Sequence, residues 1–145
     1  MSRVRWMLLP GAALLLAAGA PHHDADVVVN VTHMRSHDGK VVACLSSEAK
    51  IFPKCKGEHG RSLVLPADQA DQIRFSDVPP GRYALALLHD ENGNGKIDKA
   101  MMIPREGFGF SRDAKVSFGP PSFSDAAFDV GANGAQQSIR MRYMM

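Results

Sequence analysis

Short apolar runs separated by Gly- and Pro-containing turns recur along most of the chain. Residues 27–32 are rich in β-branched side chains, residues 72–76 alternate apolar and polar positions, and residues 82–88 are apolar on both faces. Alternation with a period of two and β-branched runs of this length are typical of strands. The pattern therefore predicts a β protein in which the doubly apolar run 82–88 is a central strand.

Further strands are expected at residues 40–45, 61–65, 126–130 and 138–143. The dipeptide Asp38-Gly39 is a strong turn signal and predicts a hairpin between the strands at 27–32 and 40–45. Short strands, frequent turns and no helical periodicity together predict an all-β fold, an antiparallel β-sandwich of about seven strands.

The first residues form a separate segment. Arg3 and Arg5 precede a short apolar run that ends in small residues, which is typical of a secretory signal peptide covering residues 1–19. Cleavage is expected after Gly19, or alternatively after Ala20, which would leave Pro21 first. The apolar run is too short for a good membrane span. We therefore expect a single domain at residues 20–145, periplasmic or secreted, with no membrane anchor after signal cleavage.

The charge balance of the chain limits the kinds of partner that it is expected to bind. The chain has 17 Lys and Arg residues against 15 Asp and Glu residues. Removing Arg3 and Arg5 with the signal peptide leaves 15 against 15. A nucleic-acid-binding protein would carry a basic cluster, and the sequence contains none. Nucleic acid is therefore not expected as a partner, and an unknown protein or small molecule remains open.

The chain contains two cysteines, Cys44 and Cys55. In an oxidising compartment they are expected to form a disulfide. Closing this short loop would stabilise the fold by about 2–3 kcal/mol. The alternative is a pair of buried or reactive free thiols. The spacing fits no metal motif.

Residues 90–98 carry oxygen-bearing side chains at the spacing of a calcium-binding loop, with Gly95 at the position of the sharp turn. The predicted ligands are Asp90, Asn92, Asn94, Lys96 through its carbonyl, and Asp98. Hard oxygen ligands suit calcium rather than zinc or copper. Met101 occupies the position where a bidentate glutamate normally completes the shell, so the expected affinity is weak, about 10⁻⁴ to 10⁻³ M in Kd. The alternative is a tight turn built on two Asn-Gly pairs, with no metal.

Three further residues are candidates for a ligand face: His89, Phe108 and Phe110. His89 could act as a ligand or an acid–base group, although a buried and hydrogen-bonded histidine is the commoner case. The glycine-flanked phenylalanines could form a binding face or an internal plug, and the phenylalanines of this segment, Phe118 and Phe123 included, are expected to pack onto the body. His22 and His23 could chelate copper or nickel, or lie in a polar tail.

Four segments together resemble one bacterial family. Residues 79–84, 89–98, 103–111 and 118–128 resemble the domain-of-unknown-function 2141 family, and the resemblance covers most of the chain after the signal peptide. The resemblance implies a small exported domain of transthyretin-like or immunoglobulin-like sandwich type. It brings no established activity and no catalytic residues.

These observations favour a non-enzymatic binding or structural module with a weak calcium-type loop. The competing hypothesis is a periplasmic enzyme or carbohydrate-binding module that uses His89, Asp90 and the Phe108/Phe110 segment. No serine, cysteine or carboxylate grouping in the sequence predicts a catalytic centre.

Overall fold

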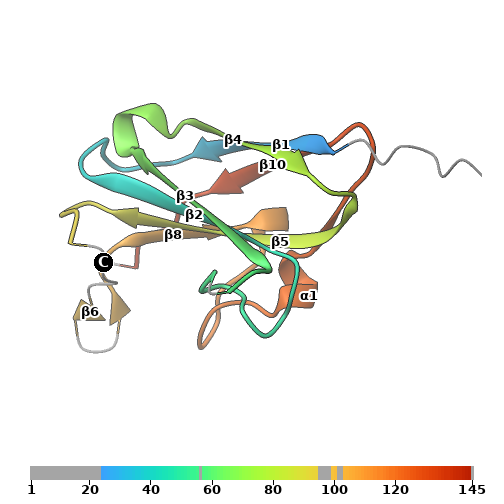
Figure 1. Cartoon of the computed structure of the whole chain (residues 1–145). Coiled ribbons are helices and arrows are strands. Elements are labelled where there is room, and N and C mark those ends of the chain that lie inside the picture. Colours follow the sequence, from blue (N-terminus) through green and yellow to red (C-terminus); the bar gives the residue numbers. More distant parts are fainter. Residues whose placement is uncertain (1–23, 56, 95–98, 101–102, 145) are drawn as a thin grey trace, which may run out of the picture.

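The chain folds into two β-sheets packed face to face (Figure 1). The computed structural model describes residues 24–55, 57–94, 99–100 and 103–144. The strands of the two sheets are β1 (Ala25–Thr32), β2 (Lys40–Ser46), β3 (Gly60–Pro66), β4 (Gln72–Val78), β5 (Gly81–Asp90), β8 (Gly107–Phe110) and β10 (Ala135–Arg140). One sheet has the order β10-β1-β4 and the other has the order β3-β2-β5-β8. A further short strand, β9 (Phe128–Val130), pairs with the start of β5.

The predicted all-β antiparallel sandwich is confirmed, with eight strands in and beside the two sheets rather than about seven. The strand pairs are antiparallel except for β1 and β10, which run parallel. A separate two-stranded hairpin is formed by β6 (Lys99–Ala100) and β7 (Ile103–Pro104). The expected signal peptide, residues 1–19, and the histidines at 22 and 23 lie outside the described residues. Within the described part of the chain, no helix is long and apolar enough to cross a membrane.

Alternate side chains of the strands fill the space between the sheets. The three-stranded sheet contributes Val27, Val29, Val31, Ile73 and Phe75, and the opposite sheet contributes Val41, Ala43, Leu45, Leu85 and Leu87. All of these side chains are at most 7% exposed. Removing this apolar surface from water is the main force that holds the two sheets together.

The predicted hairpin between residues 27–32 and 40–45 is wrong. β1 pairs with β4 and β10, whereas β2 pairs with β3 and β5, so the two strands lie in opposite sheets. Both strands carry one apolar face, and burying these faces against each other builds the core that side-by-side pairing would leave open on one side. The Asp38-Gly39 turn therefore lies in a connection between sheets rather than in a hairpin.

β5 is the central strand of its sheet, as predicted. Leu85 and Leu87 enter the main core, while Ala84 and Ala86 face outward into a second buried cluster with Phe108 and Phe110. This second cluster is covered by the loop that carries Cys55 and by the segment that follows β8. The double cover explains why β5 is apolar on both faces.

The segment after β8 contains two short helices that the sequence pattern did not reveal, η2 (Ser111–Asp113) and α1 (Phe123–Ala126); a third, η1 (Ala67–Gln69), follows β3. The Ser122 side chain caps α1 by accepting a hydrogen bond from the Asp125 N–H at 3.2 Å. Phe108 and Phe110 are buried and Phe123 packs against them. Phe118 is fully exposed, so the expectation that this phenylalanine packs onto the body is wrong.

The chain after β10 closes one side of the sandwich. The Met141 N–H donates to the Thr32 carbonyl at 2.8 Å in the first sheet. Arg142 then pairs with Phe108 of the second sheet through N–H···O bonds of 2.8 and 3.0 Å. This crossing brings Tyr143 to the end of β5, where the candidate site begins.

Candidate functional site

β5 ends in two completely buried polar residues, His89 and Asp90, each 0% exposed. The strands on either side of β5 fix their backbone positions. Lys40 of β2 pairs with Asp90, and Gly107 of β8 pairs with His89. The central strand therefore carries its polar end into the interior and delivers the first residue of the predicted calcium loop to a fixed position.

Both ring nitrogens of His89 are hydrogen bonded. Nε2 lies 2.9 Å from the carbonyl oxygen of Asp38, and Nδ1 lies 2.7 Å from the hydroxyl of Tyr143. A carbonyl can only accept, so Nε2 carries a proton and donates to Asp38, while Nδ1 and the Tyr143 hydroxyl share the second hydrogen bond. The Tyr143 oxygen in turn accepts the Arg35 N–H at 3.2 Å. His89 is therefore committed to holding the β1–β2 connection and the C-terminal segment together.

Residues 90–94 form a compact turn. The Asn94 N–H donates to Oδ1 of Asp90 at 3.2 Å and to Oδ1 of Asn92 at 3.1 Å. The Gly93 N–H donates to the Asp90 carbonyl at 3.3 Å, and Gly93 has a φ of +69°. These bonds turn the side-chain oxygens of Asp90 and Asn92 toward the inside of the loop.

Lys96 and Asp98, the other predicted ligands, lie outside the described residues, so the structure brings Asp90, Asn92 and Asn94 together and leaves the rest of the predicted set open. In the part of the chain that is described, no three His, Cys, Asp or Glu side chains are grouped to hold a metal ion. Two of the three described loop ligands are asparagines, whose amide oxygens also suit hard cations. The ion-binding role of this loop stays a prediction.

A polar network that the sequence did not predict anchors the first turn of this loop. The Arg35 guanidinium forms an ion pair with Glu91, including Nε to Oε1 at 3.1 Å, and its Nη2 reaches the Arg105 carbonyl at 3.1 Å. The Ser36 hydroxyl donates to Oε1 of Glu91 at 2.7 Å. The Arg35 guanidinium carbon also lies 4.4 Å from the centre of the Tyr143 ring, a cation–π distance.

These contacts and partial burial shift the pKa values of Glu91, Arg35 and Tyr143. Hydrogen bonds from Arg35, assisted by Ser36 and opposed by partial burial, lower the pKa of Glu91 from 4.5 to about 2. The same hydrogen bond raises the pKa of Arg35. Burial raises the pKa of Tyr143. Glu91 is therefore ionised at any physiological pH and holds the loop to the β1–β2 connection.

A second buried carboxylate lies near the start of the loop. Glu106 is 3% exposed and directly precedes Gly107, the residue that pairs with His89. If this antiparallel register continued one residue beyond β8, Glu106 would lie level with Asp90. No sequence motif marked Glu106, because it stands 16 residues from Asp90 and only strand pairing makes them neighbours.

Phe108 and Phe110, predicted as part of a ligand face with His89, are 9% and 6% exposed. Phe110 packs edge-on against Phe52 with ring centroids 5.9 Å apart, and Phe52 meets Phe123 in the same manner at 6.1 Å. His89, Phe108 and Phe110 thus lie mainly inside the molecule, and Phe108 also lines a surface groove.

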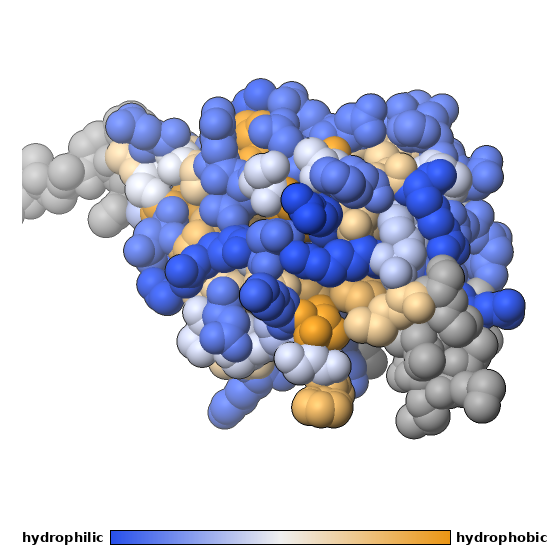
Figure 2. All heavy atoms as spheres, turned by 180° about the vertical axis from the view of Figure 1, so that it is seen from behind, coloured by the Kyte–Doolittle hydropathy of each residue, from blue (hydrophilic) through white to orange (hydrophobic). Residues whose placement is uncertain are grey.

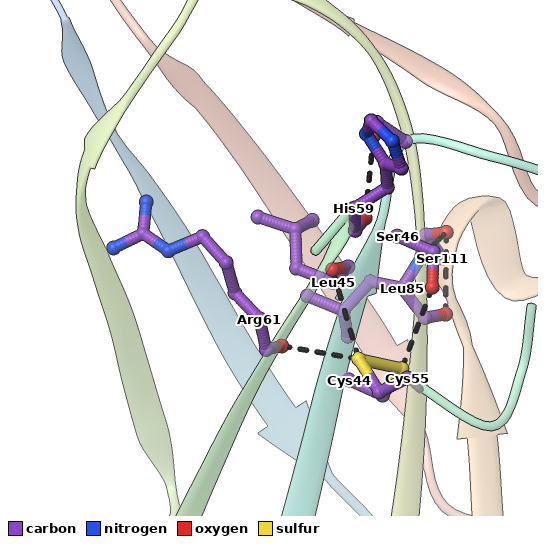
Figure 3. The surroundings of a disulfide bond; sticks show 9 residues. Cys44, Leu45, Ser46, Cys55, His59, Arg61, Leu85 and Ser111 are labelled. Carbon is purple, nitrogen blue, oxygen red and sulfur yellow. Dashed lines mark hydrogen bonds between the residues drawn. A yellow bond between two sulfur atoms is a disulfide. The ribbon is translucent and has the colours of Figure 1, made fainter. Parts of the chain in front are cut away.

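The predicted disulfide between Cys44 and Cys55 is confirmed (Figure 3). Cys44 lies on β2, and the two Cα atoms are 5.5 Å apart. The Cys55 sulfur lies 3.2 Å from the Arg61 carbonyl oxygen, at the start of β3. The Ser111 hydroxyl nearby links η2 to β5 by accepting the Leu85 N–H at 2.9 Å. The disulfide therefore holds the loop that carries Phe52 over the second buried cluster, the one that contains Phe108 and Phe110.

One protein family matches most of this chain. Residues 29–139 match the model of a family described as uncharacterized proteins conserved in bacteria (DUF2141). The chain belongs to this family. The matched region of DUF2141 runs from β1 to β10 and thus includes both sheets and the 90–98 loop. No curated protein and no solved structure matches the chain.

Membership of DUF2141 confirms the resemblance seen in the sequence, and it brings no activity with it. Asp90, Asn92 and His89 were predicted as site residues from their spacing and context, and their role stays a prediction. Sequence reasoning missed Arg35, Ser36, Glu91, Glu106 and Tyr143, which share no motif and meet only through long-range strand pairing.

Proposed function

We propose that this protein is an exported, non-enzymatic β-sandwich module whose loop at residues 90–98 binds calcium weakly. The observation that carries the proposal is the position of Asp90. Its carboxylate is completely buried at the base of the loop, and Oδ1 accepts the Asn94 N–H. From this position the Asp90 carboxylate offers a hard oxygen ligand, and the side chains of Asn92, Asn94 and Asp98 with the carbonyl of Lys96 would complete the set around a calcium ion.

We assign Glu106 as a further ligand. The loop itself has Met101 where a calcium loop normally places a bidentate glutamate. Glu106 is buried directly before β8, next to the residue that pairs with His89, and we infer that its carboxylate serves the same end of the loop as Asp90. With Asp98, this assignment brings three carboxylates to the cation, enough charge for a millimolar extracellular site.

Export is supported by the disulfide between Cys44 and Cys55, because such bonds persist in oxidising compartments. A structural rather than catalytic role is supported by His89, whose two ring nitrogens are both engaged in holding the fold. Calcium would order this end of the sandwich and stabilise the domain by mass action.

Thermal melting with calcium, magnesium or chelator tests the proposal. At a calcium concentration ten times Kd, the free energy of unfolding should rise by about 1.4 kcal/mol. Magnesium should give a smaller rise, because it demands stricter octahedral geometry.

Asn92→Ala, Asp98→Ala and Glu106→Gln should each reduce the calcium response. The matched control is Asp129→Ala, which removes an exposed carboxylate paired with Arg82 at the other end of β5. A wild-type protein whose melting is unaffected by millimolar calcium would contradict the proposal. Loop variants that keep the full calcium response would also contradict the proposal. Loss of the calcium response in the loop variants and in Glu106→Gln, but not in Asp129→Ala, would support it.

A further inference from the structure

A shallow groove of about 500 Å³ lies on the surface beside β8 and the chain that follows β10. It is lined by Phe108, Lys115, Val116, Arg142, Tyr143 and Met144. Its volume falls within the range of small-molecule sites, roughly 300–1,000 Å³. Figure 2 shows the molecule from behind, with an apolar patch lying beside strongly hydrophilic side chains. The groove combines the same two kinds of surface.

One large exposed apolar side chain, Met144, lines this groove. Among the described residues, the large exposed hydrophobic side chains are Val64, Phe118 and Met144, at 59%, 110% and 47% exposure. Met144 lines the groove, and Phe118 stands two residues beyond Val116, which also lines it. Exposed apolar clusters rimmed by polar residues are typical of binding sites.

Positive charge gathers at the same place. Lys115 and Arg142 line the groove. The Arg112 N–H donates to Oε1 of Gln137 at 3.0 Å, which holds η2, the element directly before Lys115, against β10, the strand that leads to Arg142. Within these two segments, residues 111–116 and 135–144, the only carboxylate is Asp113.

Arg142 is incompletely matched by the protein. Nη2 pairs with Oδ2 of Asp113 at 3.0 Å. Nη1 is shielded from solvent and finds no hydrogen-bond acceptor among the described residues. The Arg142 side chain is 29% exposed and lines the groove, so an anion there can approach the rest of the guanidinium and add a charge-assisted hydrogen bond.

We propose that this groove binds a small amphiphile with an apolar chain and one anionic head group. The head group pairs with Lys115 and Arg142, and the chain lies along Phe108, Val116 and Met144. The charges select the anion and the apolar floor selects the chain. This site is separate from the calcium-type loop, and the proposal does not depend on calcium binding.

Titration of the purified protein with decanoate, below its micelle concentration, tests this inference by two-dimensional NMR. Saturable shifts are expected at Phe108, Val116 and Met144, with little change at Val64. Decyltrimethylammonium, which has the same chain and the opposite charge, should bind at least about 10-fold more weakly, since Lys115 and the Arg142–Asp113 pair together leave the site with a net positive charge.

Two variants and their controls separate the contributions of charge and chain. Lys115→Glu should weaken decanoate binding by about 3- to 10-fold, the range expected for losing and reversing one exposed charge. Lys50→Glu, which changes an exposed lysine on the disulfide loop, should not. Met144→Ser should weaken binding, and Val64→Ser, which truncates an exposed side chain on β3, should leave it unchanged.

Absence of saturable shifts would overturn the proposal, as would equal binding of the two amphiphiles or equal effects of each variant and its control. Sedimentation with phosphatidylethanolamine–phosphatidylglycerol vesicles forms a second arm. Vesicle binding without decanoate binding would identify a membrane surface as the occupant and would also overturn the proposal. Because Lys115, Lys50, Met144 and Val64 are all exposed, these variants are expected to remain folded.

Discussion

The hydroxyl of Tyr143 lies 2.7 Å from Nδ1 of His89, although the two residues are 54 positions apart. Through this bond the C-terminal segment contacts the buried end of the central strand, directly before Asp90. The Tyr143 oxygen also accepts the Arg35 N–H. One phenol therefore connects three segments around the base of the 90–98 loop.

Removing the hydroxyl in Tyr143→Phe should destabilise the protein by about 1–3 kcal/mol, because Nδ1 of buried His89 and the Arg35 N–H both lose a partner. Urea unfolding measures the change. The control is Tyr83→Phe, whose hydroxyl donates to the exposed Pro79 carbonyl at 2.8 Å and should contribute about 0.5–1.5 kcal/mol. Equal losses in the two variants would show that the His89 contact has no special weight.

Stability should depend on the ionisation of Glu91. Its pKa is about 2 in the folded protein against an ordinary value of 4.5. A lowered folded-state pKa stabilises the protein above the ordinary value, and this contribution disappears as the pH falls from about 4.5 toward 2.

Because Arg35 is 41% exposed, solvent screening limits the contribution of this pair to about 1 kcal/mol or less. Unfolding of wild type and Glu91→Gln should therefore differ at pH 6 and converge near pH 2. A difference that stays constant across this range would exclude ionisation of Glu91 as its cause.

Gly39 should be intolerant of a side chain. Its φ is +71°, and a Cβ there would overlap the carbonyl oxygens of Asp90 and Glu91. Gly39→Ala should thus cost more than the roughly 1–2 kcal/mol of a left-handed conformation alone.

Gly57→Ala is the matched control, since Gly57 has a φ of +91° and no atom within 4 Å of the added Cβ. Denaturant midpoints of the two variants measure the excess. If both lose the same stability, then backbone conformation alone, and not the close approach of β5, sets the need for glycine at position 39.

Loss of the disulfide should destabilise the fold by about 3 kcal/mol from loop closure alone. Cys44→Ser/Cys55→Ser should also loosen the loop that holds Phe52 against Phe110. Methyl and aromatic NMR signals of the second buried cluster, around Phe108 and Phe110, should then broaden. Signals of the main core, such as those of Ile73 and Val29, should keep their positions. Unfolding in denaturant with and without a reductant measures the free energy. A change confined to the main core would contradict this assignment.

The sequence by itself determined the fold class, the central strand and the disulfide pairing. Each depends on information that is local or nearly so: a period of two, an apolar run on both faces at 82–88, and only two cysteines to pair. The spacing of Asp90, Asn92 and Asn94 is also visible in the sequence, because a loop that brings oxygen atoms together carries them at short intervals.

Only the tertiary structure decided which strands become neighbours. The apolar pattern of two strands does not say whether they pair in one sheet or pack against each other from opposite sheets. The turn at Asp38-Gly39 therefore predicted a hairpin, whereas β1 and β2 lie in opposite sheets. The same long-range pairing brings Arg35, Glu106 and Tyr143 to the loop. It also brings Lys115 and Arg142, which are 27 positions apart, to one surface groove. These residues are distant along the chain, and only the burial of both sheets against one another brings them together.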